Sequence, residues 1–426
     1  MRCCLLSLSP IADDPRVRRQ GDALHALGWT VSAVGLPARR SPPPAWPVRT
    51  VDVPEPGTGM VERALRIGRV ALAGRCGPLL LPLVEGMPAT RQLLAGAEGV
   101  VADLYVANDW TALPAAAILA ARHGGRLVYD SHELAVAERE EDARWRLLYG
   151  RLAGAVEERF IRSAALVTTV SEGIADAMAA AYRLRERPVV IRNVPVHRAM
   201  PLRQPDPGRI RVLFQGLLAP GRGIEALLRS VPLWRPEFHL ILRGPAGDAY
   251  RAELAALARA TGVEARILFD PPRPPGQLVE AANEADIGIH PLEPVNRNNR
   301  LALPNKIFEY LMAGLAVCVS DLPELAAVVR RHDCGRLIGA VTPEAIADAV
   351  NGFSPSGIAD GKRNALAAAR ELCWEREREV LIRAYTAAGG GGRAPLKTET
   401  FSGDRGQPFA GDPSDIADIS TNGART

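Results

Sequence analysis

The sequence LPNKIFEYLMAG at residues 303–314 lies between two short apolar runs at residues 287–290 and 317–320. We predict a helix over residues 305–313 and a strand over each apolar run, which together form the strand–helix–strand unit of a parallel sheet. The helix begins just past the carboxyl end of a strand, and ligands bind at this edge of α/β sheets. This unit therefore indicates both the fold class and the place where a site should lie.

The same alternation of short apolar strands and helices runs along the whole chain. In the first half, strands are predicted at residues 3–8, 30–35, 104–107, 127–130, 166–170 and 189–193, and helices at 13–27, 60–75, 110–123, 138–162 and 172–182. In the second half, strands are predicted at 210–215, 238–243, 267–270, 287–290, 317–320 and 335–338, and helices at 224–231, 247–261, 275–284, 305–313, 323–331, 343–350 and 361–387. We therefore predict an α/β fold with two Rossmann-like domains whose parallel sheets face a central cleft.

Breaks in composition suggest where the domains end. Residues 194–208 are rich in proline and polar residues and separate the two halves, and residues 37–58 form a proline-rich excursion. After residue 388 the chain is rich in glycine and polar residues, so we expect disorder there. The predicted parts are an N-terminal domain over 1–195, a linker over 196–209, a C-terminal domain over 210–370, a closing helix over 371–388 and a tail over 389–426.

Composition narrows the classes of partner. The chain has 426 residues, of which 47% are hydrophobic and 23% charged, as is usual for globular proteins. A net charge of +4 is too small to indicate a nucleic-acid partner, and we expect none. The six cysteines are scattered without metal-ligand spacing, which favours buried thiols in a reducing compartment.

The sequence carries no sign of export or membrane insertion. Residues 1–10 lack the long apolar region and cleavage site of a signal peptide. No segment reaches the roughly 18 uncharged apolar residues that span a bilayer. We therefore expect a cytoplasmic protein, with peripheral contact at the inner face of the membrane left open.

The helix at residues 305–313 offers groups for an anion and a sugar. A helix N-terminus presents free N–H groups at Asn305 and a positive dipole end, and Lys306 adds a full charge. Glu309 lies one turn further on and could accept hydrogen bonds from sugar hydroxyls. A phosphate and a ribose would satisfy all of these groups. An ordinary amphipathic helix with a solvated lysine and glutamate explains the pattern equally well.

A glycine-rich turn opens the second half. Residues 214–224 read FQGLLAPGRGI, which places Gly216 and Gly223 between a strand and a helix. Glycine lets backbone N–H groups approach a ligand closely, and Arg222 could bind a diphosphate through two parallel hydrogen bonds. The turn does not match the dinucleotide fingerprint G-x-G-x-x-G, and a surface arginine in a tight loop is the simpler alternative.

Polar residues also follow two strands of the first half. His132 and Glu133 come just after the strand that ends at Asp130, and Asp109 follows the preceding strand. These residues should share one sheet edge, where His132 could hold a proton or contact a phosphate. A histidine that caps the next helix is the alternative.

An acidic pair with a nearby arginine follows the first strand. Asp13 and Asp14 are suited to cap the next helix, and Arg16 could also reach into the cleft. No D-x-D element follows any predicted strand, so we expect no metal ion and no cofactor. Arg222, Lys306 and helix ends would have to meet the charge of a diphosphate.

These segments together resemble the retaining nucleotide-sugar glycosyltransferases of the GT-B fold, in the large group 1 (family-4) set. The resemblance covers residues 2–386 and depends mainly on 303–314, 129–134, 214–224 and the opening motif 14–19. It implies an N-terminal acceptor-side domain, a C-terminal donor domain and a closing helix that crosses back to the first domain. The acceptor-side candidates are Asp13, Arg16, Asp109 and Glu133.

The family pattern assigns roles and also shows departures. By resemblance, Glu309 binds the nucleotide ribose and His132 lies near the donor phosphate and the reacting carbon. Leu301 stands where the family has a second glutamate, so Asn298, Asn299 or backbone N–H groups of residues 302–305, beside Leu303, could take over its sugar contact. The family arginine after the first glycine is replaced by Leu217, and the glycine pair expected within residues 9–14 is missing.

The resemblance implies a front-face displacement in which the leaving diphosphate takes the acceptor proton. The protein would then stabilise charge on that diphosphate through Arg222, Lys306 and the helix start at Asn305. The acceptor could be a glycan, a lipid-linked sugar or a small molecule. A nucleotide-sugar 2-epimerase of the same fold and a non-catalytic nucleotide-sugar binding protein remain alternatives.

Two arginine-rich stretches of the first half raise the question of a membrane. Residues 61–84 combine four arginines with an apolar run, and residues 138–162 form a second basic stretch. Basic amphipathic helices can lie on anionic lipid. Helices that pack on the sheet and expose their arginines to water are the alternative, and Pro78 and Pro82 interrupt any single helix over the first stretch.

Overall fold

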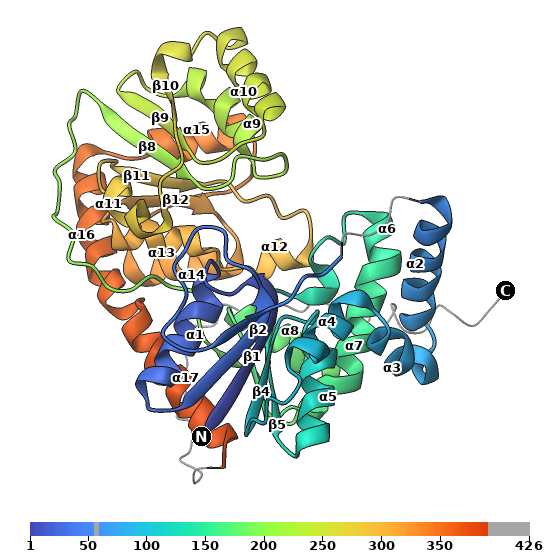
Figure 1. Cartoon of the computed structure of the whole chain (residues 1–426). Coiled ribbons are helices and arrows are strands. Elements are labelled where there is room, and N and C mark those ends of the chain that lie inside the picture. Colours follow the sequence, from blue (N-terminus) through green and yellow to red (C-terminus); the bar gives the residue numbers. More distant parts are fainter. Residues whose placement is uncertain (55–58, 391–426) are drawn as a thin grey trace. The chain divides into compact units, whose positions relative to one another are not determined.

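A computed structural model describes residues 1–54 and 59–390 of the chain (Figure 1). The chain divides into two compact units. Unit 1 contains Met1–Arg192, Asn296–Asn298 and the described chain from Arg378 onward, and unit 2 contains Asn193–Val295 and Asn299–Glu377. Residues 55–58 of the predicted excursion and residues 391–426 of the predicted tail lie outside the described residues.

Unit 1 is built on a seven-stranded parallel sheet with the order β3-β2-β1-β4-β5-β6-β7. The strands are β1 (Arg2–Pro10), β2 (Thr30–Leu36), β3 (Val48–Thr50), β4 (Leu104–Asn108), β5 (Arg126–Asp130), β6 (Leu166–Thr169) and β7 (Val189–Val190). Cys3 of the central strand pairs with Val31 on one side and with Leu104 on the other. Helices cover both faces of the sheet, which explains why the central strands are apolar runs without alternation.

The helices of unit 1 connect these strands. They are α1 (Pro15–Ala26), α2 (Met60–Ala73), α3 (Gly77–Glu85), α4 (Pro88–Gly96), α5 (Leu113–His123), α6 (Ala143–Trp145), α7 (Arg151–Phe160), α8 (Glu172–Tyr182) and the second half of α17 (Trp374–Ala388). In Figure 1, α1 and α17 lie on one side of the sheet and α4 and α5 on the other. The chain order reverses between β1 and β4, and this switch point places polar groups at their carboxyl ends.

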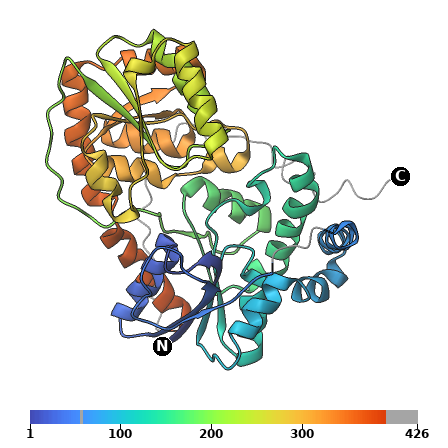
Figure 2. The ribbon, with the colours of Figure 1, turned by 45° about the horizontal axis from the view of Figure 1, so that its top comes forward.

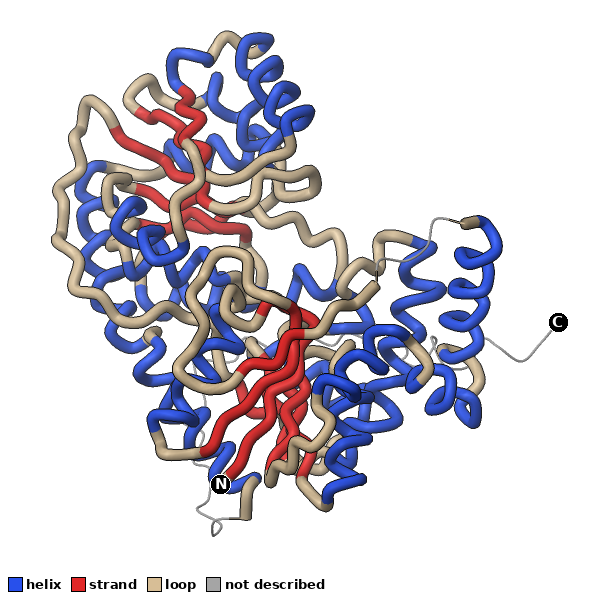
Figure 3. The backbone as a smooth tube through the Cα atoms, in the orientation of Figure 1, coloured by secondary structure: helices blue, strands red, loops and turns tan. Residues whose placement is uncertain are grey.

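Unit 2 repeats the plan with six parallel strands in the order β10-β9-β8-β11-β12-β13. The strands are β8 (Ile210–Gln215), β9 (Phe238–Arg243), β10 (Ile267–Asp270), β11 (Ile287–His290), β12 (Ala316–Ser320) and β13 (Gly335–Ile338). The helices are α9 (Ile224–Ser230), α10 (Asp248–Ala260), α11 (Leu278–Ala282), α13 (Asn305–Met312), α14 (Pro323–His332), α15 (Pro343–Asn351) and α16 (Pro355–Glu371). Figures 2 and 3 show the strands of this sheet running between helices. The predicted α/β class with two parallel Rossmann-like sheets is confirmed.

The core of unit 2 is apolar, and the charged lysine buried beside it is paired. Side chains of β8 and β9, including Phe214 and Phe238, pack with α9, α10 and α15 on one face of the sheet. On the other side, the fully buried Lys362 of α16 donates hydrogen bonds to the Ala285 carbonyl at 2.9 Å and to Asp286 at 3.1 Å. Burial lowers the pKa of Lys362, while the Asp286 carboxylate opposes that shift.

Several predicted elements were wrong in detail. The helix predicted over 138–162 begins only at Ala143 and contains a π-helical turn over Arg146–Gly150, because Asp142 caps its start. The helix predicted over 361–387 is two helices, which break between residues 371 and 374. The predicted excursion contains β3, and the residues before 303, for which no element was predicted, contain α12 (Arg297–Leu301).

The prolines of the first basic stretch act differently from expectation. Pro78 does not break a helix but occupies the first turn of α3, where its missing N–H costs nothing. Pro82 lies inside α3. The interruption instead falls at residues 74–76, between α2 and α3. No helix of the described chain is both long and apolar enough to cross a membrane.

Candidate functional site

In unit 2 the switch point lies between β8 and β11, and the Lys306 side chain crosses it. Gly216, directly after β8, has a φ of 133°, a conformation that favours glycine. A Cβ atom on Gly216 would lie 2.3 Å from Cε of Lys306 and 3.1 Å from its Nζ. Glycine at this position therefore gives the lysine stem its path from α13 across the end of β8.

Lys306 is a positive charge in an unfavourable setting. Burial, then the nearby Arg222, lower its pKa to about 8, while Glu309 raises it. Its Nζ lies 5.7 Å from the centre of the Phe214 ring, which contributes a weak cation–π contact. Within the described residues the ammonium group donates no hydrogen bond to the protein. A site that depresses a lysine pKa in this way is suited to an anion that the protein does not itself supply.

Arg222 lies in the turn 216–223, whose last residue is held against β11. Gly223 has a φ of 70°, and a Cβ atom there would lie 2.2 Å from the carbonyl oxygen of Pro291. This close approach sets the end of the turn beside the end of β11. Arg222 is partly buried, and its charge lowers the pKa of both Lys306 and His290. The three side chains therefore share one small region.

His290 is a site residue that our sequence reasoning missed. It is the last residue of β11 and only 2% exposed, and its Nδ1 atom has no hydrogen-bond partner among the described residues. Burial, then Lys306 and Arg222, hold its pKa well below the ordinary value, so the ring is neutral. Its place at a strand end beside the glycine-rich turn was the available signal.

Glu309 is held in position from β8. Its Oε2 atom accepts a hydrogen bond from Nε2 of Gln215 at 3.2 Å. The backbone N–H of Gln215 in turn donates to the hydroxyl of Tyr310 at 2.9 Å. Because Gln215 is buried and fixed at both its backbone and its side chain, the Glu309 carboxylate is oriented before any ligand arrives.

The other predicted donor residues surround the start of α13. Leu303 is buried, and Asn305 is exposed as the first residue of the helix. Pro304 occupies the N-cap position and provides no side-chain hydrogen bond to the helix. Asn299 donates a hydrogen bond to the Glu293 carbonyl at 2.9 Å. The N-terminus of α13 therefore lacks a side-chain cap at the point where Lys306 leaves it.

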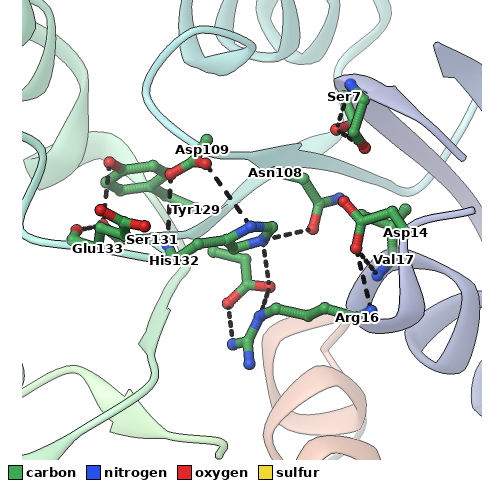
Figure 4. A network of polar contacts seen from close by, with 12 residues as sticks. Ser7, Asp14, Arg16, Val17, Asn108, Asp109, Tyr129, Ser131, His132 and Glu133 are labelled. Carbon is green, nitrogen blue, oxygen red and sulfur yellow. Dashed lines mark hydrogen bonds and ion pairs between the residues drawn. The ribbon is translucent and has the colours of Figure 1, made fainter. Parts of the chain in front are cut away.

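In unit 1 the corresponding switch point contains a buried ion pair, shown in Figure 4. Arg16 of α1 donates from Nε and Nη2 to the two carboxylate oxygens of Asp130, at 2.8 Å and 2.6 Å, and from Nη1 to the Ile191 carbonyl at 2.7 Å. Thr168 and Gln20 donate to the same carboxylate. Burial opposes ionisation of Asp130, but Arg16 and His132 together hold its pKa well below the ordinary range.

His132 lies between two carboxylates. Its Nε2 atom is 3.4 Å from Oδ2 of Asp130 and its Nδ1 atom is 3.6 Å from Oδ2 of Asp109 (Figure 4). Asn108 contacts Nε2 at 3.3 Å. Burial lowers the pKa of His132, but the two aspartates outweigh burial and raise it. The two carboxylates therefore favour the protonated form of the ring.

The predicted acceptor-side residues of unit 1 are engaged by the protein. Asp14 is the N-cap of α1, whereas the Asp13 carboxylate accepts hydrogen bonds from the backbone N–H groups of Arg39 and Ser41 at 2.6 Å and 2.7 Å. Arg16 is 7% exposed and its guanidinium is bound in the ion pair, so the geometry indicates a structural role for this residue. Roles of Asp13 and Arg16 in acceptor binding stay predictions.

Glu133 is the acceptor-side candidate with proton-transfer capacity. Burial, then Glu138 and Asp109, raise its pKa to about 7. Its Oε2 atom accepts a hydrogen bond from Nδ2 of Asn298 at 2.8 Å, and the backbone N–H of Leu134 donates to the other end of the Asn298 amide at 2.8 Å. Residues 296–298 belong to unit 1 through such contacts. In the described chain, no group of three His, Cys, Asp or Glu residues could hold a metal ion.

Two protein families match the chain. Residues 14–194 match the glycosyl transferase 4-like domain, and residues 209–353 match the glycosyl transferases group 1. The D-inositol 3-phosphate glycosyltransferase of Rhodococcus erythropolis is 27% identical over 193 residues, which are 43% of this chain and 42% of that protein. The enzyme of that name from Actinosynnema mirum is 31% identical over 201 residues, 45% of this chain and 43% of that protein. The chain thus spans about two fifths of the length of these curated relatives.

Solved structures resemble the chain over most of its length. Sucrose-phosphate synthase from Thermosynechococcus elongatus has a TM-score of 0.69 at 16% identity and covers 91% of this chain and 98% of its own. Anabaena HepE in complex with UDP and glucose has a TM-score of 0.63 at 18% identity, with 91% and 100% covered. At these identities the likeness shows the fold. With the two matching families, it places this chain among the group 1 glycosyltransferases of the GT-B fold.

Proposed function

We propose that this protein transfers a sugar from a nucleotide-sugar donor to an acceptor hydroxyl. One observation carries the proposal: Lys306 and Arg222 lie close together at the β8/β11 switch point, next to the oriented carboxylate of Glu309. In the described protein, neither of these two basic side chains donates a hydrogen bond to a carboxylate. Two cations would meet the charge of a diphosphate, and a carboxylate would accept hydrogen bonds from ribose hydroxyls. HepE, of the same fold, is described in complex with UDP-glucose, which supports a nucleotide-sugar donor.

The proposed reaction retains the configuration of the donor sugar, as the family resemblance implies. As the bond between sugar and diphosphate breaks, negative charge grows on the leaving diphosphate. Lys306, Arg222 and the uncapped N–H groups at the start of α13 are placed to stabilise that charge. The leaving diphosphate takes the acceptor proton, so no protein nucleophile is needed. The raised pKa of His132 suits a role near the donor phosphate or the acceptor.

We further propose that the donor is bound without a metal ion, since two basic side chains can offset the diphosphate charge. Activity should therefore survive treatment with EDTA and should not rise when Mg²⁺ or Mn²⁺ is restored. The measurement is the initial rate before and after chelation. An enzyme that recovers only with added divalent metal would contradict this part of the proposal.

A panel of nucleotide sugars tests the proposed reaction against its alternatives. A glycosyltransferase should release nucleoside diphosphate mainly when an acceptor is present, and D-inositol 3-phosphate is a first acceptor to try because of the curated relatives. A 2-epimerase would change the sugar without an acceptor, and a binding protein would bind the donor but leave it intact. The panel also identifies the base and the sugar.

The proposed setting is the cytoplasm, with peripheral contact at the inner face of the membrane. On α2, Met60, Val61 and Leu65 are 86%, 71% and 69% exposed, which is unusual for large apolar side chains. Arg63, Arg66 and Arg69 lie on the same helix. Such a helix could lie on anionic lipid, and co-sedimentation with anionic vesicles that weakens as salt rises would support this contact. Equal recovery in the supernatant with neutral and anionic vesicles at low salt would contradict it.

A further inference from the structure

A pocket of unit 1 is lined by residues of α2 and of the segment around α6. It has a volume of about 470 Å³, which is within the range of small-molecule sites. Figures 1 and 2 show α2 beside the segment that contains α6. The lining combines four arginines, one aspartate, two aromatic residues and three aliphatic residues: Arg63, Arg66, Arg139, Arg144, Asp142, Trp145, Tyr149, Ile67, Val70 and Leu148.

The charge of this pocket is unbalanced. Asp142 is its only carboxylate, and that side chain already accepts hydrogen bonds from the backbone N–H groups of Arg144 and Trp145 as the N-cap of α6. The same carboxylate lies 3.5 Å from Arg139. Within the described chain, the guanidinium groups of Arg63, Arg66 and Arg144 have no carboxylate partner. Three positive charges from two distant parts of the sequence therefore face one concave space.

The aromatic wall of the pocket is fixed by an unusual backbone. The π-helical turn over Arg146–Gly150 follows Trp145, and such turns often occur at functional positions. A Cβ atom on Gly150 would lie 3.2 Å from the Trp145 ring, so the small residue lets the ring pack closely on the turn. The pocket consequently offers a flat apolar surface beside its cationic groups.

Arginines on helix surfaces are often simply solvated, but a planar guanidinium also binds phosphate through two parallel hydrogen bonds. Here several guanidinium groups converge on a concave surface that also has an aromatic wall. We propose that this pocket binds a phosphate monoester or diester whose organic part packs on Trp145 and Tyr149. The proposal does not depend on the nucleotide-sugar site, since every lining residue belongs to unit 1 and none to the Lys306 region.

The phosphate could belong to a free phosphorylated small molecule or to a lipid headgroup. Met60, Val61 and Leu65 on α2 would favour the second source, because exposed apolar side chains beside a phosphate site can enter the headgroup region of a bilayer. The chemistry at the pocket is the same in both cases. The test therefore needs one arm for each source.

The test uses the full chain and a pair of matched double variants. Arg66→Gln with Arg144→Gln removes two pocket charges, whereas Arg91→Gln with Arg185→Gln removes two exposed charges elsewhere in unit 1. One arm titrates glycerol 3-phosphate by calorimetry, and the other measures co-sedimentation with phosphatidylglycerol vesicles against phosphatidylcholine vesicles. Urea denaturation of every variant shows whether unit 1 is still folded, and binding of a nucleoside diphosphate, which should be unchanged, shows that the donor site is separate.

We expect the pocket variant to lose roughly tenfold or more in affinity for the probe that binds, since charge-assisted hydrogen bonds to the phosphate are lost. The control variant should stay within about twofold of the parent. Saturable binding of glycerol 3-phosphate identifies a free ligand, and binding only to anionic vesicles identifies a headgroup. Equal losses in the pocket and control variants, or no binding of either probe by the parent protein, would overturn the proposal.

Discussion

The Arg16 cluster of unit 1 and the Lys306 cluster of unit 2 each lie near the switch point of strand order in their own parallel sheet. In unit 1, Arg16 is bonded to both oxygens of Asp130 and to a carbonyl. In unit 2, Lys306 donates no hydrogen bond to the described protein, and Arg222 lowers its pKa further. We call the Arg16 cluster complete, because its positive charge is paired with a carboxylate of the protein, and it should mainly stabilise the fold. We call the Lys306 cluster incomplete, because its positive charges have no such hydrogen-bonded carboxylate in the described protein, and it should mainly bind an anion.

The largest effect should come from breaking the complete cluster. Asp130→Asn leaves Arg16 buried without its counter-charge, so the free energy of unfolding should fall by about 3–5 kcal/mol. Urea denaturation measures this change. Asp103→Asn, which breaks the exposed pair between Arg2 and Asp103, is the control and should change stability far less. A stable Asp130→Asn protein that has merely lost activity would show that this cluster, too, serves ligand binding.

Substitutions in the Lys306 cluster should lower activity while leaving stability nearly unchanged. Lys306→Ala and Arg222→Ala should each lower kcat/KM by roughly 2–4 kcal/mol in transition-state free energy, as for loss of one preorganised donor. Stability should hardly change, because neither side chain has a carboxylate bonded to it in the described protein. Steady-state kinetics and urea denaturation are measured together, with Arg251→Ala on the exposed face of α10 as the control. Near-parental kcat/KM in both variants would place the diphosphate elsewhere.

Glu309 provides a further test of whether the Lys306 cluster binds a ligand, since its carboxylate lies in that cluster and is already oriented by Gln215. Glu309→Gln should weaken nucleoside diphosphate binding by roughly 1–3 kcal/mol, because charged hydrogen bonds to the ribose are lost. Calorimetry measures the affinity, and Glu253→Gln on α10 controls for loss of a negative charge. Unchanged affinity in Glu309→Gln would remove this residue from the site.

The smallest effect is a pH dependence of donor binding. Lys306 has a pKa of about 8 in the free protein, so it is charged below that pH and progressively neutral above it. Affinity for a nucleoside diphosphate should therefore fall by about 1 kcal/mol between pH 7.5 and pH 9. Lys306→Arg keeps its charge over this range and should flatten the profile. A parental profile that is already flat would mean that Lys306 does not contact the anion.

Local patterns in the sequence predicted most of the fold. The bounds of β8, β9, β10, β11 and β13 match the prediction, because most of them are short apolar runs set between turn residues. In contrast, β3 has three residues and forms only because β2 pairs with it, so no pattern in the local sequence predicts this strand. The π-helical turn within the predicted helix 138–162 likewise follows from packing rather than from periodicity.

Part of the candidate site was predictable from the rule that ligands bind at the carboxyl ends of parallel strands. That rule led to His132 and to Lys306, whose settings are unusual in the structure. It could not reveal that Arg16 pairs with Asp130, because the partners are 114 positions apart and an ion pair leaves no pattern in either segment. The neutral state of His290 was equally hidden, since it results from burial of the ring and from two cations brought close by the fold.

The second half of α17 gives unit 1 an unusual order of assembly. Tyr385 is fully buried in that unit, and its hydroxyl accepts a hydrogen bond from Gln20 at 2.6 Å across 365 positions of sequence. Gln20 also donates to Asp130, so the network around the ion pair extends to this last helix. During synthesis the N-terminal unit therefore cannot close its core until residue 385 has left the ribosome. The N-terminal domain of a protein generally folds first during synthesis. Here unit 1, which is synthesised first, completes its fold only after the second half of α17 has been made.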